Sequence, residues 1–448
     1  MSLTNFVPGS SGSNVCVRDL TSIFQKEALE YAMYSIQERA LPSMIDGFKP
    51  VQRFVLYSTI KNAPKEYKKS ASISAVVADL GYHHGEASAT AALALMASDW
   101  NNNFSIIEGR GNFGSRLVQE GAAARYIFAR LHKNFDNVFK DIDLAPVHDD
   151  PEHIPAKFYV PVIPMVLVNG IQGIATGFST NILPHDPEWL KKATLEQVTK
   201  NKITSEPVVK FPQFKGKIVH EGEGKYTQLG NVSISGLTVT VTEIPTSYDH
   251  AKYVAVLYAL QDKGVITSWD DKTKEDFKFI VRFRRGSDMS ESEVIKALKL
   301  SKSFTQNINT IGVYEQLCPY DNVLDLIRDF VDYRMGFLQK RIDVSLEQSK
   351  EQALIANVKV QFIEAVNNGT IVLRGKTKAE AIQLIKKTLP EVKDTHITIL
   401  LGMRIDQMTS DEIERLKKQQ QQSEAEHVYW NTTNPKAEFQ KDLKSLTF

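Results

Sequence analysis

The C-terminal third of the chain carries the pattern that most restricts how this protein can fold. Apolar and small residues recur there at intervals of three and four positions. They are Ile327, Val331, Met335, Leu338, Ile342, Leu346, Ser349, Ala353, Ala356, Val360 and Ile363. This spacing predicts one helix of about forty residues, roughly 60 Å long at 1.5 Å per residue. A helix of that kind must bury its apolar stripe against a partner.

A second long helical stretch is predicted from about Ser410 through residues 417–422, after a short globular segment. Two long helices around a small apolar tip at 397–403 predict an antiparallel coiled coil. The core of an ordinary helix bundle has the same spacing and remains the alternative. We assign residues 321–448 to this helical part.

The middle of the chain, residues 151–320, is predicted to be an α+β domain. It opens with four prolines, at 151, 155, 161 and 164. Alternating, β-branched stretches at 216–222, 232–245 and 277–286 predict a mostly antiparallel sheet, and residues 251–262 have a helical pattern.

Residues 17–150 form the first zone, which is rich in alanine, glycine and histidine and mostly helical in pattern. Helices are predicted over 86–100 and 126–142, with a short strand and a glycine-rich loop between them. Residues 1–16 are expected to be a flexible tail. The fold class is therefore α+β multidomain, with boundaries near 16, 150 and 320.

Composition excludes several classes of protein. The 54 Lys and Arg residues against 53 Asp and Glu leave a net charge of +1, which argues against a uniformly basic coat. Two cysteines, Cys16 and Cys318, exclude a disulfide scaffold and a four-cysteine zinc site, and we expect a reducing, intracellular compartment. No run of eighteen apolar residues predicts a membrane span, and the N-terminus lacks the order of a signal peptide.

Basic residues cluster in the first zone. Between Arg110 and Lys133 the chain also carries Arg116, Arg125 and Arg130, against the single acid Glu120. Further basic residues precede them, at Arg39, Lys49, Arg53, Lys61, Lys65, Lys68 and Lys69. Such a cluster is typical of a groove that binds a phosphate backbone, although a solvated charged face has the same composition.

Two short motifs have competing interpretations. Residues 109–114 fit G-x-G-x-x-G, but no apolar helix is predicted directly after them, so a turn with backbone amides free for phosphate is favoured over a dinucleotide site. His83 and His84 could suggest a metal, but adjacent side chains diverge and no third ligand is well spaced. A structural role or a hydrogen bond to an anion is favoured.

Arg125 and Tyr126 lie in the basic stretch, directly after the small residues 121–124. A tyrosine hydroxyl, with an ordinary pKa of about 10, is a poor nucleophile unless it is activated. Adjacent guanidinium groups would favour the phenolate and stabilise charge on a pentavalent phosphorus. The positions of these residues in the sequence do not by themselves identify Tyr126 as a nucleophile.

Several long motifs in order make the chain similar to the DNA breakage-reunion subunit of type IIA DNA topoisomerases. They are residues 39–42 (RALP), 46–53 (DGFKPVQR), 81–86 (GYHHGE), 111–114 (GNFG), 123–126 (AARY), 169–177 (NGIQGIATG), 242–245 (TEIP) and 401–404 (LGMR). The contiguous His83-His84-Gly85-Glu86 lacks the proline of the bacterial pattern and resembles the enzymes of tailed bacteriophages and eukaryotes. The resemblance covers nearly the whole chain.

The resemblance implies a fold and a reaction. It implies a winged-helix domain over 17–150, a tower domain over 151–320, and a coiled coil ending in a helical dimer gate over 321–448. Tyr126 from each of two protomers would attack one DNA strand, giving a 5′-phosphotyrosyl link, and a second duplex would pass through the break. The chain would act as a homodimer on double-stranded DNA.

Individual roles follow from the same matching. Arg125 would stabilise the transition state, assisted by Arg39 and His84, and His83 is less certain because the proline is missing. Lys49 and Arg53 would bind the DNA backbone, and Ile174 matches the family's intercalating isoleucine. Without the resemblance, Ile174 would be placed in the core. Arg110 and Arg116 are candidates for DNA binding from the charge cluster alone.

The chain has neither a Walker-type loop nor the acidic cluster of the family's magnesium-binding domain. We therefore expect Mg²⁺ and ATP to be bound by partner subunits, with no metal ligand in this chain, and a location in the cytoplasm, that of the infected bacterium for a phage protein. The alternatives are a non-catalytic architectural DNA-binding protein on the same scaffold and, less well supported, a nucleotide-binding oxidoreductase.

Overall fold

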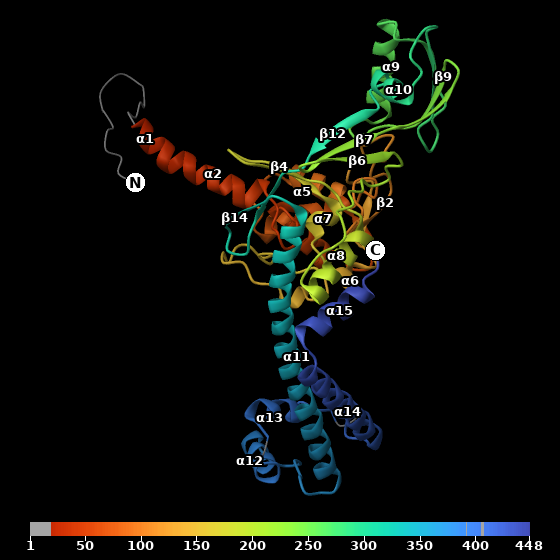
Figure 1. Cartoon of the computed structure of the whole chain (residues 1–448). Helices are drawn as coiled ribbons and strands as arrows, with labels where there is room; N and C mark the ends of the chain where they lie inside the picture. The colour runs from red at the N-terminus through yellow and green to blue at the C-terminus, as the bar shows by residue number, and fades with distance from the viewer. Residues whose placement is uncertain (1–18, 391, 405–406) are drawn as a thin grey trace. The chain divides into compact units, whose positions relative to one another are not determined.

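The computed structural model describes residues 19–390, 392–404 and 407–448, so the tail expected at 1–16 lies outside them (Figure 1). The chain divides into two compact units. The first is Met1–Asp332 with Asp442–Phe448, and the second is Tyr333–Lys441. Both helices and sheets are present, as expected of an α+β chain. The finer boundaries near 150 and 320 stay predictions.

The first unit begins with helical segments and one small sheet. In chain order these are α1 (Leu20–Ser22), η1 (Ile23–Ala28), α2 (Leu29–Ser35), η2 (Ile36–Ala40), α3 (Pro50–Asn62), β1 (Lys68–Lys69), α4 (Ser70–Ala75), η3 (Val76–Leu80), α5 (Glu86–Met96), β2 (Ile107–Arg110), β3 (Phe128–Leu131), α6 (Phe135–Val138) and η4 (Ile142–Leu144). Pro50 opens α3, where its missing N–H costs nothing. The helix predicted at 86–100 is α5, which ends at Met96.

The helix predicted over 126–142 is wrong. Residues 128–131 form β3, which pairs antiparallel with β1 on one side and β2 on the other. Ile127 and Leu131 are buried, as a helix would also bury them. The backbone partners of β3 come from residues 68–69 and 107–110, so the local pattern could not reveal them.

The rest of the first unit carries the strands that alternation predicted. Its elements are α7 (Met165–Asn169), β4 (Ile171–Ile174), β5 (Ser179–Ile182), α8 (Pro187–Lys200), β6 (Lys217–Gly222), β7 (Lys225–Leu229), β8 (Asn231–Ser235), β9 (Thr238–Glu243), α9 (His250–Asp262), β10 (Ile266–Asp271), β11 (Phe279–Phe283), α10 (Glu291–Ala297), β12 (Ser301–Thr305), β13 (Ile308–Ile311) and β14 (Leu317–Tyr320). The strand orders are β10-β11-β9-β8 and β12-β7-β6, with two further pairs, β4-β5 and β13-β14, and these strands pair with one another antiparallel throughout. The antiparallel prediction is confirmed.

The four-stranded sheet has a well-defined apolar core. Val239, Val241, Phe279 and Val281 are fully buried on one face, where α9 covers them through Tyr253 and Leu257. This core supports the end of β9, where the 242–245 motif begins.

The second unit is helical. Its elements are α11 (Val323–Asn367, which starts in the first unit), α12 (Lys378–Thr388), α13 (Asp394–Leu401), α14 (Ser410–Thr432) and most of α15 (Pro435–Ser445). The long predicted helix is thus one continuous element of 45 residues. Lys417 pairs with Glu364 at 2.9 Å, and His427 Nδ1 lies 3.2 Å from the carbonyl oxygen of Leu346. These contacts make α11 and α14 antiparallel.

At the far end of α11, α12 and α13 lie beside its C-terminal half (Figure 1). Phe362 of α11, Ile385 of α12 and Leu400 of α13 are buried in one cluster. The apolar tip predicted at 397–403 therefore belongs to a small helical core that α11, α12 and α13 form together.

Candidate functional site

Tyr126 lies in a tight turn directly before β3. Its side chain is 65% exposed, whereas the next residue, Ile127, is buried. The backbone N–H groups of Ser70 and Ala71, at the start of α4, donate to the carbonyls of Ile127 and Ala124 at 2.9 and 3.2 Å. The turn is therefore held on both flanks, and the tyrosine side chain is left open to an approaching ligand.

Arg125 accompanies the tyrosine. The carbon Cζ of its guanidinium lies 4.6 Å from the centre of the Tyr126 ring, a cation–π distance. Both side chains are exposed. The pair therefore offers a hydroxyl nucleophile and a permanent positive charge on the same surface.

A second group gathers around His84, just before α5. Its Nε2 lies 2.7 Å from the hydroxyl oxygen of Tyr34 on α2. The ring of Tyr82 meets the His84 ring edge-on, with 5.4 Å between the centres. Burial raises the pKa of Tyr82, and the charge of Arg39 acts against that shift. Arg39, Tyr34, Tyr82 and His84 thus form one cluster, beside which His83 is exposed.

The structure does not bring all predicted catalytic residues together. Among the described residues, no hydrogen bond, ion pair or ring contact joins the Arg125–Tyr126 pair to the Arg39–His84 cluster. Sequence analysis missed Tyr34, which lies fifty residues from His84 in the chain. No local spacing could have identified it.

Lys49 and Ile174 lie on neighbouring segments. Lys49 is the N-cap of α3, and its Nζ donates to the carbonyl of Gln172 in β4 at 2.7 Å. Burial lowers the pKa of its amine. Ile174 ends β4 and is 87% exposed, which excludes the alternative that it is a buried core residue.

Two predicted DNA-binding arginines are buried instead. Arg53 donates from Nε and Nη2 to Asp46 at 2.8 and 3.1 Å and to the carbonyl of Phe48 at 2.9 Å. Asp46 is fully buried and also accepts from the N–H groups of Phe48 and Tyr159. This placement does not agree with direct contact between Arg53 and DNA. Arg53 instead fixes the turn before α3.

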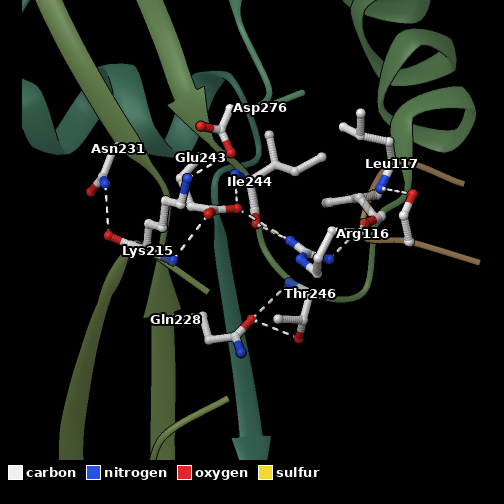
Figure 2. A network of polar contacts seen from close by, with 11 residues as sticks. Arg116, Leu117, Lys215, Gln228, Asn231, Glu243, Ile244, Thr246 and Asp276 are labelled. Atoms are coloured by element: carbon white, nitrogen blue, oxygen red, sulfur yellow. Dashed lines mark hydrogen bonds and ion pairs between the residues drawn. The ribbon is translucent and has the colours of Figure 1, made fainter. Parts of the chain in front are cut away.

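Arg116 has a similar placement (Figure 2). Its Nη2 donates to Glu243 at 3.1 Å and to the carbonyl of Ile244 at 3.0 Å, and both paired side chains are less than a tenth exposed. Burial lowers the pKa of Arg116, and Glu243 acts in the opposite direction. Direct DNA contact is not supported here either. The pair anchors the glycine-rich loop before Tyr126 onto β9.

Arg110, in contrast, is exposed at the end of β2, with its guanidinium 5.8 Å from the centre of the Tyr67 ring. Its placement is compatible with binding a phosphate. The Gly109–Gly114 motif runs from the end of β2 into a loop: Gly111 and Gly114 have φ of +111° and +83°, and no helix follows before Tyr126. The dinucleotide alternative therefore has no structural support.

No group of three or more His, Cys, Asp or Glu side chains within the described ranges could hold a metal ion. A magnesium ion has no fitting donor set there. None of the helices in this part of the chain is long and apolar enough to cross a membrane.

Comparisons with known proteins show which proteins this chain is similar to. The family model of the DNA gyrase/topoisomerase IV A-subunit matches residues 39–445. The DNA topoisomerase medium subunit of Enterobacteria phage T4 is 46% identical over 441 residues, which cover 96% of this chain and 99% of the relative. The mitochondrial DNA topoisomerase 2 of Dictyostelium discoideum is 27% identical over 98% of this chain, which spans only 36% of that relative.

Among solved structures, the DNA-binding, cleavage and re-ligation domain of Plasmodium falciparum topoisomerase II matches with a TM-score of 0.86 and 26% identity. The match covers 99% of this chain and 66% of that one. Sequence and fold agree along nearly the whole length, and this chain belongs to the DNA gyrase/topoisomerase IV A-subunit family.

Proposed function

We propose that this chain is the DNA-cleaving and rejoining subunit of an ATP-dependent type II DNA topoisomerase, an isomerase that passes one duplex through a transient break in another. The observation that carries the proposal is Tyr126, exposed in a braced turn with Arg125 against its ring. The phage relative, which this chain matches over 99% of its length, is named as a topoisomerase subunit.

The reaction follows from the groups present. The hydroxyl oxygen of Tyr126 attacks a backbone phosphorus, the bond from phosphorus to the 3′ oxygen breaks, and a 5′-phosphotyrosyl link forms. The phenol loses its proton and the 3′ oxygen gains one. One phosphodiester replaces another, so the reverse attack by the 3′ hydroxyl reseals the strand. Arg125, with Arg39 and His84, would stabilise the added negative charge on phosphorus.

The remaining predicted parts fit this role. Helices α3 to α5 with the sheet β1-β3-β2 would be the winged-helix domain, the sheets from β6 to β12 the tower, and the second unit the coiled coil and dimer gate. Lys49 and Arg110 would bind the DNA backbone, and Ile174 would wedge between bases. The chain would act as a homodimer.

Other components lie outside this chain. We assign Mg²⁺ to a partner subunit because the described residues provide no metal site, and the ion would supply charge neutralisation there during strand cleavage. We assign ATP to a partner as well, because this sequence has no Walker-type loop. The T4 relative suggests the cytoplasm of an infected bacterium as the location.

A covalent-capture assay tests the proposal. The chain is mixed with its ATPase partner, Mg²⁺ and end-labelled duplex DNA, and the reaction is stopped with denaturant. We expect labelled DNA attached to the chain, and we expect Tyr126→Phe to abolish it while DNA binding stays nearly intact, because only the hydroxyl is removed.

Tyr314, which is 86% exposed, provides the matched control, and Tyr314→Phe should leave capture unchanged. Adducts that persist in Tyr126→Phe would reassign the nucleophile. DNA binding and bending without any adduct in the unmodified chain would favour the architectural alternative.

A further inference from the structure

The hairpin β4–β5 presents Ile174 to solvent on a support that comes from elsewhere in the chain. Ile174 pairs across the hairpin with Ser179, and the N–H of Ala175 donates to the carbonyl of Phe178 at 2.8 Å to close the turn. An isolated two-stranded hairpin is only marginally stable. A wedge that kinks DNA must resist the restoring force of the stacked bases, so the hairpin needs bracing.

Two asparagines brace the strand opposite Ile174. The side-chain amides of Asn307 and Asn309 both donate to the carbonyl of Ser179, at 2.8 and 2.7 Å. A carbonyl oxygen has two lone pairs, so it accepts both bonds. Asn309 also donates to the side-chain oxygen of Asn307 at 3.2 Å, which couples the two amides.

The backbone around these residues reinforces the contact. Asn307 and Asn181 exchange backbone hydrogen bonds at 3.0 and 2.8 Å, and the N–H of Asn309 donates to the Thr180 hydroxyl at 3.2 Å. Residues 307–309 thus lie alongside β5 and support it through these hydrogen bonds. The side-chain amides of Asn307 and Asn309 converge on Ser179, the cross-strand partner of Ile174.

The other strand of the hairpin is held as well. A Cβ added at Gly173 would lie 2.1 Å from the carbonyl oxygen of Ala40, so β4 runs directly against the end of η2. Lys49 donates to the carbonyl of Gln172. Both strands are therefore fixed beside Ile174, which is itself 87% exposed.

We infer that Asn307 and Asn309 are positioning residues for DNA bending: their paired amides hold Ser179 so that Ile174 acts as a rigid wedge. The inference rests on the proposed function, in which Ile174 enters DNA. Without the amides the hairpin would tilt away from the stacked bases, and DNA would stay straighter at the same occupancy.

The test uses the full chain with its partner subunit and a duplex that carries a fluorophore at each end. Energy transfer at saturating protein reports bending, a titration reports affinity, and covalent capture reports cleavage. For the double variant Asn307→Ala/Asn309→Ala we expect bending and cleavage to fall about fivefold or more, as loss of the two hydrogen bonds to the Ser179 carbonyl implies, with affinity nearly unchanged.

A second duplex, gapped at the kinked step, separates positioning from general damage. Such a duplex bends at little cost, so a rigid wedge is no longer needed. Cleavage of the gapped duplex by the double variant should return to near the unmodified level. Asn231→Ala is the matched control, because Asn231 donates its amide to the carbonyl of Lys215 away from the hairpin.

Asn309→Ala alone, which keeps the Asn307 amide bonded to the carbonyl of Ser179, should show the same pattern more weakly, and it replaces the double variant if that variant does not fold. Bending and cleavage equal to those of Asn231→Ala would overturn the inference. Equal loss on both duplexes would also overturn it, because a gapped duplex bypasses the wedge. If the unmodified chain neither bends nor cleaves DNA, the proposed function itself fails.

Discussion

Ile174 shows how far exposure decides a residue's role. Isoleucine is a common core residue, yet here it is 87% exposed at the end of a hairpin, with Gly173 buried before it. Its β-branched side chain has few rotamers to lose on contact with a ligand. Exposure, stiffness and a braced hairpin together favour a wedge.

Ile174→Ala should therefore leave the free energy of unfolding within about 0.5 kcal/mol of the unmodified value, as is usual for surface substitutions. A buried isoleucine would instead cost about 2–5 kcal/mol. DNA bending and cleavage should fall. Denaturant unfolding and end-to-end energy transfer measure the two effects. A large loss of stability with bending unchanged would return Ile174 to a structural role.

His185 makes stability depend on pH. It is completely buried, and burial lowers its pKa to about 4, from an ordinary value of about 6.5. Between these values the unfolded chain binds the proton and the folded chain does not. Stability should therefore fall as the pH drops from about 6.5 to 4, by up to about 3 kcal/mol from this residue.

His185→Leu removes that titration, so its unfolding free energy should depend less steeply on pH across the same window. The measurement is denaturant unfolding at a series of pH values, with the slopes compared. Equal slopes in the two proteins would show that His185 does not carry the effect.

At the scale of elements, the contact between the glycine-rich loop and β9 is the least expected feature. Arg116 lies ten positions before Tyr126 and forms an ion pair with Glu243, the last residue of β9. The other oxygen of Glu243 accepts from the N–H of Lys215, so three segments meet at one carboxylate (Figure 2). The loop that leads to Tyr126 is thus anchored to the sheet.

Glu243→Ala should destabilise the chain by about 3–5 kcal/mol, because it leaves the Arg116 guanidinium buried without its counter-charge. Adding Arg116→Ala should cost less than the sum of the two single changes. Lys215→Ala is the control, since its ion pair with Asp276 is exposed and should contribute at most about 1 kcal/mol. Additive losses would mean that Arg116 and Glu243 act independently.

For the whole molecule, the second unit is where we propose that two copies of the chain associate. Its cluster of buried residues from α11, α12 and α13 leaves Ile399 of α13 40% exposed at the tip. A long helix that ends in a small helical core with an exposed apolar residue is suited to pack against a second copy of this chain. This agrees with the proposal of a dimer gate.

Ile399→Lys should weaken dimerisation, because a desolvated ammonium at an apolar interface has no partner. Sedimentation velocity over a range of concentrations measures the change, and thermal unfolding checks the fold. Val428→Lys is the control, since Val428 is 61% exposed on α14, away from that cluster. An undiminished dimer would place the interface elsewhere.

Local regularities in the sequence determined a large part of the fold. The three-and-four spacing predicted α11, alternation predicted β6, β8, β9 and β11, and both patterns arise from the direction of side chains along one element. The motifs around Tyr126, His84 and Ile174 identified the family, because several long matches in order leave little room for chance. These inferences need only neighbours in the chain.

Only the tertiary structure decided which charged groups face solvent. By sequence, Arg53 and Arg116 belong to a basic cluster. In the folded chain Arg53 is buried in an ion pair with Asp46. Arg116 is buried in an ion pair with Glu243, which lies 127 positions away along the chain. In the same way, residues 128–131 form β3 where a helix was predicted. The strands that pair with β3 lie about twenty and sixty residues away along the chain. Tyr34 and the asparagines at 307 and 309 reach their sites from distant segments. A buried charge and a strand both require partners that only the folded chain brings together, so local sequence could not specify them.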